Sequence, residues 1–325
     1  MRRHLAASLA FLGPIAASSV AETSDAAVEF TGQSRSLHAE SNSSAGLWAE
    51  GANPSPPPTL SFQDSDSDDA SAGGFGVFDT SVASAAPDVL IFPLTGTAAA
   101  SHTSSLSTTT ISASASTDTA TDSYWLTAPQ LTIVNQQLSP PTYYLGLERD
   151  ASASESLFSV AFDVSAPTPY GLTGSLDVSP VTADFTLIGT SWSQATGSIE
   201  LRHALGGSVA QVAIDQYEFC TPGPPGSGEM TCTAGSRPLS AQGVLAPGSY
   251  VLEARSGSSA TAFCAIVFSL VCLDISNSSD FTLALEFGEP LPAPLPGLAP
   301  VSLGALVLAL AATGLRARRH LRVSR

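Results

Sequence analysis

The sharpest cluster of chemically active side chains in this sequence is an acidic run. Asp64, Asp66 and Asp68 occupy alternate positions, as the first three ligands of a calcium loop do, and Asp69 adds a fourth carboxylate. An EF-hand needs glycine at its sixth position and glutamate at its twelfth, where the sequence has Asp69 and Phe75. An EF-hand is therefore excluded. A looser surface calcium site stays a candidate, although we favour the alternative, a solvated acidic linker.

Four cysteines indicate an oxidising compartment. Cys220 and Cys232 flank a Pro- and Gly-rich segment that can close on itself, and a disulfide there would stabilise the fold by about 3 kcal/mol in the chain-entropy model. Cys264 and Cys272 remain as a pair by elimination. If 265–271 is one strand, their Cα atoms lie roughly 26 Å apart, while a disulfide needs less than about 7 Å. Either the chain turns between them or each pairs elsewhere. No cysteine spacing matches a zinc site, so we expect no metal there.

Signatures of catalysis are missing from the sequence. It contains no lysine, which excludes a P-loop or a Schiff-base enzyme, and it has no GxSxG or HExxH motif. A pI near 4.4 argues against nucleic acid as a partner, because phosphate binding needs a basic surface. We therefore expect a protein that is not an enzyme and that carries no cofactor.

Aromatic side chains are the candidates for binding sugar. Tyr124, Trp125, Tyr143, Tyr144 and Trp192 offer flat apolar faces that can stack on a polysaccharide. The alternative is that they pack in the protein core, which we favour for each of them. Burial of these side chains would weaken the sugar-binding hypothesis, and exposure on one face would strengthen it.

The first 21 residues have the layout of a secretory signal peptide. A basic start at 1–4 is followed by an apolar stretch at 5–17, and Ser19 and Ala21 are small residues before the expected cleavage at Glu22. The apolar stretch is too short to span a bilayer, which needs about 20 apolar residues. We expect export through the inner membrane.

The other end of the sequence predicts a membrane span. Residues 297–315 carry no charge, and at about 1.5 Å per residue they reach roughly 28 Å, close to the hydrocarbon thickness of a bilayer. A basic tail that includes Arg316, Arg318 and Arg319 follows directly. The positive-inside rule keeps this tail cytoplasmic and places the preceding chain outside. The precursor is thus expected to be a single-pass membrane protein.

A Pro-rich segment precedes the expected span and cannot join a helix or a sheet ladder. Together with the span and the arginine tail, Pro290, Leu291, Pro292 and Ala293 resemble the PEP-CTERM sorting signal of Gram-negative bacteria, in its VPLPA-like variant, with Glu289 in place of the valine. This resemblance implies an exosortase as processing partner, removal of the tail, and delivery to the cell surface or matrix. The other interpretation is a plain membrane anchor.

Between the two ends, alternation typical of strands replaces any helical period. Phe158–Val164 and Phe281–Phe287 alternate apolar with small or polar residues, and 101–116 alternates Ser and Thr with Leu, Ile and Ala. Many short strands separated by Gly and Pro predict an all-β fold over 22–288, an antiparallel sandwich that is jelly-roll-like. We expect an acidic, Pro-rich loop at about 41–76.

The expected mature chain is strongly acidic, because all 28 acidic residues but only five arginines lie in 22–289, a net charge of −23. We predict a cell-surface or biofilm-matrix protein with a structural or adhesive role that is not catalytic. The alternative is a carbohydrate-binding surface module with extracellular polysaccharide as partner. A third possibility is a secreted hydrolase without a visible signature.

Overall fold

A computed structural model of the chain describes residues 27–49, 58–89, 96–138, 141–180, 182–183, 193–222, 230–266, 270–289 and 291. The predicted signal peptide, the predicted membrane span and the arginine tail lie outside these residues. Among the described residues, no helix is long and apolar enough to cross a membrane.

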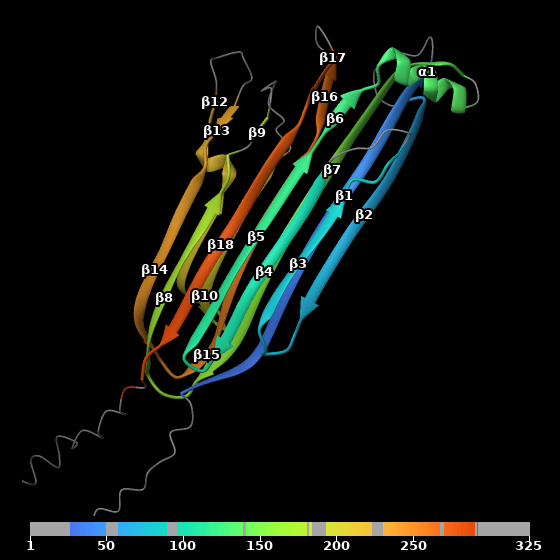
Figure 1. Ribbon diagram of the computed structural model, residues 1–325. Coiled ribbons are helices and arrows are strands. Elements are labelled where there is room, and N and C mark those ends of the chain that lie inside the picture. Colours follow the sequence, from blue (N-terminus) through green and yellow to red (C-terminus); the bar gives the residue numbers. More distant parts are fainter. Residues whose placement is uncertain are drawn as a thin grey trace, which may run out of the picture.

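Two antiparallel sheets make up the described chain, and they face each other as a sandwich (Figure 1). Sheet A contains β1 (Val28–Ala49), β2 (Leu60–Ala72), β6 (Ser123–Trp125), β7 (Tyr143–Val164), β10 (Gln194–His203), β11 (Ser208–Asp215) and β15 (Gly248–Thr261). Sheet B contains β3 (Phe78–Ala85), β4 (Thr97–Ser107), β5 (Thr110–Thr121), β8 (Thr168–Val178), β9 (Thr182–Ala183), β14 (Gly235–Leu245) and β18 (Ile275–Phe287).

Smaller elements lie at one end of the sandwich (Figure 1). They are the helix α1 (Ala128–Gln137), the 3-10 helix η1 (Gln216–Phe219), the strand pair β12 (Cys220–Pro222) and β13 (Met230–Cys232), and the strand pair β16 (Phe263–Ile266) and β17 (Leu270–Leu273).

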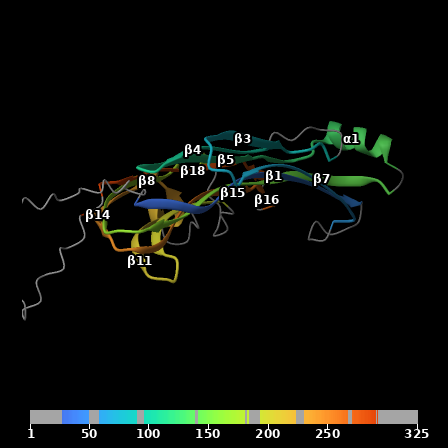
Figure 2. The same cartoon turned by 90° about the horizontal axis from the view of Figure 1, so that it is seen from below.

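The strand orders explain how the two sheets cover each other. Sheet A runs β11-β10-β15-β7-β1-β2 and sheet B runs β14-β8-β18-β5-β4-β3, with β6 beside β7 and β9 beside β18. Contacts between the sheets join β15 to β18, β7 to β5, and the edge strands β2 to β3 and β11 to β14. Figure 2 shows the two layers from below. The strands β1 and β7 each have 22 residues, roughly 70 Å at about 3.4 Å per residue, so the sandwich is long and narrow.

The all-β prediction is confirmed, as are the strands expected at Phe158–Val164, Phe281–Phe287 and within 101–116. The loop expected at about 41–76 is wrong over much of its length, because β1 continues to Ala49 and β2 covers Leu60–Ala72. Residues 63–69 of β2 are polar at every position, yet β2 pairs with β1 from Arg35↔Ala72 to Leu47↔Leu60. Backbone pairing holds them extended without an apolar alternation.

The absence of any helix was also a wrong expectation, because α1 covers Ala128–Gln137. Its start follows local rules: Thr127 and Gln130 form a capping box, and Pro129 lies in the first turn. Leu131 and Val134 are its buried residues. The helix closes the end of the sandwich where β7 begins.

Apolar side chains form the core at the end of the sandwich where β1 begins and β18 ends. Phe158, Phe162, Leu176, Leu252 and Leu285 are at most 1% exposed within this cluster. Two smaller clusters lie elsewhere, one around Leu37 between β1, β3 and β4 and one around Leu47 beneath α1.

Between these clusters the interior is polar. The inward side of β7 changes from Phe158 to Ser156, Ser154, Ser152 and Asp150, all buried. The hydroxyls bond to the backbone of the facing sheet: Ser152 Oγ donates to Ala120 O at 3.3 Å, and Ser154 Oγ donates to Asp118 O at 3.2 Å. Buried hydroxyls need such partners. Side chains this short reach the facing backbone only if the sheets lie closer than the about 10 Å usual for stacked sheets.

Candidate functional site

The acidic run lies on β2, at the edge of sheet A, and not in a loop. Asp66 Oδ2 accepts the backbone N–H of Ala85 at 3.3 Å, and Asp68 Oδ2 accepts the N–H of Ala83 at 3.3 Å. Both donors belong to β3, the edge strand of sheet B. Asp64 Oδ1 instead accepts the N–H of the next residue, Ser65, at 2.9 Å. Two of the three alternating carboxylates therefore bind backbone of the facing sheet.

No group of three His, Cys, Asp or Glu side chains within the described part of the chain is placed to hold a metal ion. The aspartates of β2 are extended along one strand, which separates side chains that a calcium loop would curl around one ion. The loop on which the calcium hypothesis depended is thus replaced by a strand.

The opposite side of the sandwich has a comparable link. Arg237 of the edge strand β14 donates from Nη1 to the carbonyl oxygen of Ala213 on the edge strand β11, at 2.8 Å. The same guanidinium forms an ion pair with Glu218. Acid side chains thus bind N–H groups at one side, and an arginine binds a carbonyl at the other.

The predicted disulfide Cys220–Cys232 is confirmed, and it joins directly opposite residues of β12 and β13. The backbones of Cys264 and Cys272 are also directly opposite, on β16 and β17. The chain therefore turns between them, which removes the separation of roughly 26 Å that a single strand would impose. A disulfide between this second pair stays a prediction.

The aromatic residues considered for sugar stacking lie near α1. Tyr143 is 5% exposed and belongs to the core cluster beneath the helix, while Tyr124 and Trp125 are half-buried. Tyr124 donates to Glu148, and Trp125 packs against Trp48 with ring centroids 6.0 Å apart. Trp192 lies outside the described residues. The burial of these side chains weakens the sugar-stacking hypothesis.

Tyr144 is the exception among them. It lies at the start of β7 and is 41% exposed. One exposed ring does not make the flat row of aromatic faces that the sugar-stacking hypothesis requires.

Two fully buried carboxyl groups lie inside the same end of the sandwich. Glu148 and Asp150 are 0% and 1% exposed, and no arginine or histidine of the described residues forms an ion pair with either. Burial raises the pKa of Asp150 to about 8, and the charge of Asp122 adds to the rise. Burial likewise raises the pKa of Glu148. We expect Asp150 to be largely protonated at neutral pH.

The backbone packs closely around this acid. Asp122 donates its N–H to Asp150 Oδ1 at 2.7 Å, and a Cβ placed on Gly96 would overlap the Asp150 carboxyl. A residue larger than glycine at position 96 would displace this carboxyl. The acid is therefore part of the packing of this end.

A buried arginine and a buried histidine lie further along the interior. Arg35, 1% exposed, donates to Ser104 Oγ at 3.0 Å and to the carbonyl of Gly76 at 2.9 Å. His102 bonds through Nδ1 to Ser156 Oγ at 3.0 Å, and burial lowers its pKa to about 4. His102 is thus neutral and packed among aromatic rings. A general base must reach a proton of the substrate, which this buried position does not allow.

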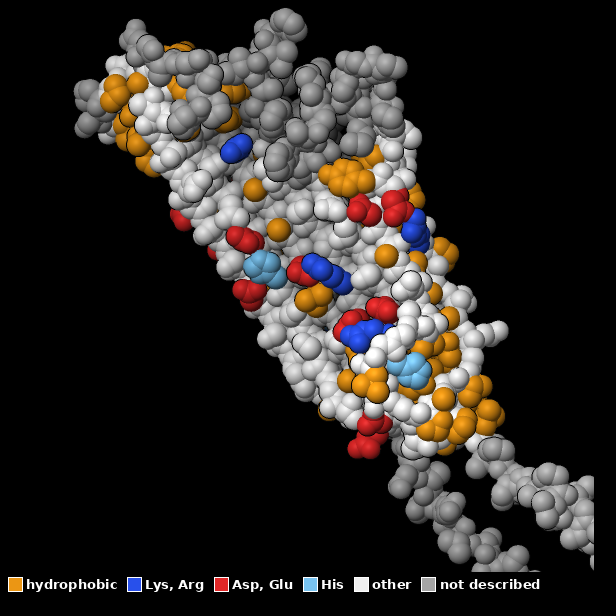
Figure 3. All heavy atoms as spheres, turned by 180° about the vertical axis from the view of Figure 1, so that it is seen from behind, with side chains coloured by type: hydrophobic (Ala, Val, Ile, Leu, Met, Phe, Trp, Pro, Cys, Tyr) orange, Lys and Arg blue, Asp and Glu red, His pale blue; other side chains and the backbone are white. Residues whose placement is uncertain are grey.

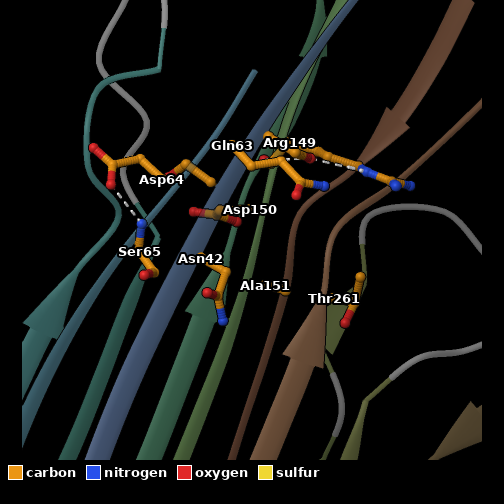
Figure 4. Close-up of a pocket in the computed structure, with 10 residues that line it drawn as sticks. Asn42, Gln63, Asp64, Ser65, Arg149, Asp150, Ala151 and Thr261 are labelled. Atoms are coloured by element: carbon orange, nitrogen blue, oxygen red, sulfur yellow. Dashed lines mark hydrogen bonds between the residues drawn. The ribbon is translucent and has the colours of Figure 1, made fainter. Parts of the chain in front are cut away.

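The outward face of sheet A carries two neighbouring hollows, which we call the sheet A groove. Figure 3 shows this face, with charged side chains spread along its middle. The first hollow has a volume of about 470 Å³ and the second about 240 Å³. Figure 4 shows the first, in which Asn42, Gln63 and Arg149 come from three strands, with Thr261 across from them. The second is lined by His38, Ala153, Glu155, Gln194, Arg255 and Ser259, among others.

Hydrogen bonds and ion pairs hold the walls of the groove. Arg255 Nε pairs with Glu155 Oε1, and Arg149 Nε donates to Ser44 Oγ at 3.3 Å. His38 Nδ1 lies 2.7 Å from Asp69 Oδ1, and this hydrogen bond is the main cause that raises the pKa of His38.

Of the predicted sorting residues, only Leu291 is described by the structure. It is 45% exposed, and its N–H donates to Pro167 O at 2.8 Å. Pro290, Pro292 and Ala293 lie outside the described residues, and so do Arg316, Arg318 and Arg319.

The buried carboxyls were missed at the sequence level, although a signal exists. In β7 the residues with the parity of Phe158 point inward, and extending that parity backwards places Asp150 and Glu148 inside. The groove had no such signal, because it depends on the alignment of five strands.

Comparison with known proteins shows no match to a family model and none to a curated protein. Among solved structures, the chain is similar to an infectious bursal disease virus VP2 subviral particle, with 9% identity, 88% of this chain and 89% of that chain covered, and a TM-score of 0.17. A structure of the Gx strain of this virus gives 6% identity, 82% and 79% coverage, and a TM-score of 0.14. Similarity this low carries no argument about fold or function.

Proposed function

We propose that this protein is exported, carried to the cell surface or biofilm matrix by an exosortase-processed C-terminal signal, and acts there in a structural or adhesive role without catalysis. One observation carries the proposal: the described chain enters and leaves the sandwich at the same end. The Ser165 N–H donates to Ala27 O at 2.9 Å, and the Leu291 N–H donates to Pro167 O at 2.8 Å, so the first and last described residues both lie beside the turn between β7 and β8.

This geometry suits a precursor that is held in the membrane by its C-terminal tail until the tail is removed. The chain enters and leaves beside one turn, and the sandwich extends roughly 70 Å away from it. The helix α1 and the two short strand pairs lie at the far end (Figure 1). In the membrane-held precursor, α1 and the disulfide-bonded hairpin would thus lie at the end of the sandwich away from the membrane.

The sorting signals in the sequence support this localisation. The signal peptide at 1–21, the motif Pro290–Ala293, the span at 297–315 and the arginine tail resemble the PEP-CTERM arrangement in that order. A disulfide in the exported part agrees with an oxidising compartment. Links across both open sides of the sandwich keep the edge strands from pairing with other chains, which suits a protein at high local concentration.

Cell fractionation tests this proposal in a Gram-negative host that has an exosortase. We compare the full chain with a variant lacking 290–325 and with a variant in which Pro290–Ala293 is replaced by Gly and Ser. We expect the full chain to lose its tail and reach the surface, the deletion variant to be released without a membrane stage, and the motif variant to stay in the membrane uncleaved.

The matched control replaces the Pro-rich segment 54–57 by Gly and Ser, and it should be processed like the full chain. An unchanged membrane location for both the full chain and the deletion variant would contradict the sorting proposal. So would normal cleavage of the motif variant, measured by the mass of the surface form.

A further inference from the structure

We propose that the sheet A groove binds a neutral, polyhydroxylated chain, that is, a polysaccharide without charged groups. This inference deepens the proposed surface role, because it assigns the adhesive site and its ligand class. It differs from stacking on aromatic rings, which the burial of Tyr143 and Tyr124 disfavours.

The two hollows are neighbours along the sheet. Ala151 and Ala153 are successive outward residues of β7, and Thr261 and Ser259 are their partners on β15. Ala151 and Thr261 line the larger hollow, and Ala153 and Ser259 line the smaller one. An extended ligand that lies along β7 and β15 can therefore reach both hollows.

Small side chains create the depression. The strands β7 and β15 present Ala151, Ala153 and Gly257 along its floor. Longer side chains rise on both sides, Asn42 and Gln63 from β1 and β2 and Gln194 from β10. A trough with a flat backbone floor and polar walls accommodates a chain that lies along it.

The chemistry of the walls suits hydroxyl groups. Amides, hydroxyls and a guanidinium–carboxylate pair supply both donors and acceptors, as sugar hydroxyls require. None of the described lining residues is Phe, Tyr, Trp, Leu, Ile or Val, so an apolar ligand would bury little matching surface. Each hydrogen bond contributes little after desolvation, so we expect weak binding per site and stronger retention by long chains.

Charge favours a neutral chain over an acidic one. Arg255 is paired with Glu155, and His38 lies between Asp69 and Glu40, so two of the three cations that line the groove have carboxylate partners, while Arg149 donates to Ser44 Oγ. The expected mature chain has a net charge of −23 from 28 acidic residues and five arginines, and it repels a polyanion.

Affinity electrophoresis tests the inference on the full chain, purified in a zwitterionic detergent that has no sugar headgroup. Native gels contain dextran, pullulan or hydroxyethyl cellulose as neutral probes, or alginate as the acidic probe. We expect at least one neutral polysaccharide to retard the protein. Ala153→Leu should raise the apparent dissociation constant about fivefold or more, because the added side chain fills the floor of the groove.

Ala99→Leu is the matched control, since Ala99 is a half-buried outward residue of β4 on the other sheet. A second pair keeps the test valid if Ala153→Leu perturbs the fold: Gln63→Ala should weaken retardation, and Gln242→Ala on the exposed face of β14 should not. Thermal unfolding confirms that the variants fold.

No retardation by any neutral probe would overturn the inference, as would retardation by alginate alone or equal retardation of wild type, Ala153→Leu and Gln63→Ala. These results are independent of cell fractionation. Sorting can therefore succeed while binding fails, and the two failures are distinguishable.

Discussion

Asp66 Oδ2 of β2 accepts the backbone N–H of Ala85 of β3 at 3.3 Å, although the two strands belong to different sheets. The neighbouring pair, Asp68 and Ala83, repeats the contact one step along. An unpaired edge strand exposes N–H groups that can pair with another chain. The carboxylates take the place of a neighbouring strand and close this side of the sandwich.

Replacing both carboxylates should open that edge. We expect Asp66→Ala combined with Asp68→Ala to lower the free energy of unfolding by about 1–2 kcal/mol, because two hydrogen bonds are lost. The exposed N–H groups of β3 should also increase self-association, measured by sedimentation velocity. Asp64→Ala is the control, since Asp64 Oδ1 accepts the backbone N–H of its neighbour Ser65 and, among the described residues, makes no hydrogen bond to β3. Equal behaviour of the double variant and the control would contradict the prediction.

The buried acid Asp150 should make stability depend on pH. Its pKa is about 8 in the folded protein against 3.8 as the ordinary value, so the folded state keeps a proton that the unfolded state loses between these values. The stability that this proton provides is fully present below pH 3.8 and is lost as pH rises towards about 8, by at most about 1.4 kcal/mol per pH unit.

Asp150→Asn should remove this part of the pH dependence and raise the unfolding temperature at pH 8 relative to wild type. Its amide oxygen can still accept the N–H of Asp122. Asp163→Asn, on the exposed side of β7, is the control and should leave the pH profile in place. Parallel profiles for wild type and Asp150→Asn from pH 4 to pH 8 would refute the protonated state.

The register of β16 and β17 predicts a second disulfide, Cys264–Cys272. We expect the protein, produced in an oxidising compartment and unfolded without reductant, to show no thiol that reacts with iodoacetamide, and peptide mapping by mass spectrometry to find this pair linked. Cys220–Cys232 serves as the internal reference, because its bond is seen in the structure. Two alkylated cysteines at 264 and 272 would show that the pair stays reduced.

Arg35 should be among the most sensitive positions of the interior. Arg35→Met leaves the carbonyls of Gly74 and Gly76 and the hydroxyl of Ser104 without their donor, which should cost about 2–4 kcal/mol in urea unfolding. Arg255→Met removes only an exposed ion pair and should change stability by about 0.5 kcal/mol or less. Similar losses in both variants would mean that burial of Arg35 is unimportant.

The sequence predicted the sandwich where apolar residues alternate, as in Phe158–Val164 and Phe281–Phe287. It failed at β2, where the alternating residues are aspartates, because an apolar pattern is what distinguishes a half-buried strand from a loop. The order of the strands could also not be predicted from the sequence. Pairing such as β1 with β7 joins segments a hundred residues apart, which no local pattern encodes.

The candidate site was predictable only in part. The bond between Cys220 and Cys232 followed from a turn-rich segment between two cysteines. The sheet A groove brings Gln63, Ala153 and Gln194 to one face, and only the register of five strands does this. The aromatic residues were conspicuous in the sequence, yet most of them pack around α1.

The Ser- and Thr-lined interior has a consequence for how stability varies with temperature. Exposing apolar surface raises the heat capacity of unfolding, whereas exposing polar surface lowers it. A protein that buries Ser152, Ser154, Ser256 and Ser279 where others bury leucine exposes less apolar surface when it unfolds. Its free energy of unfolding should therefore follow a broad, shallow curve, so that the protein keeps nearly constant stability from cold water to warm.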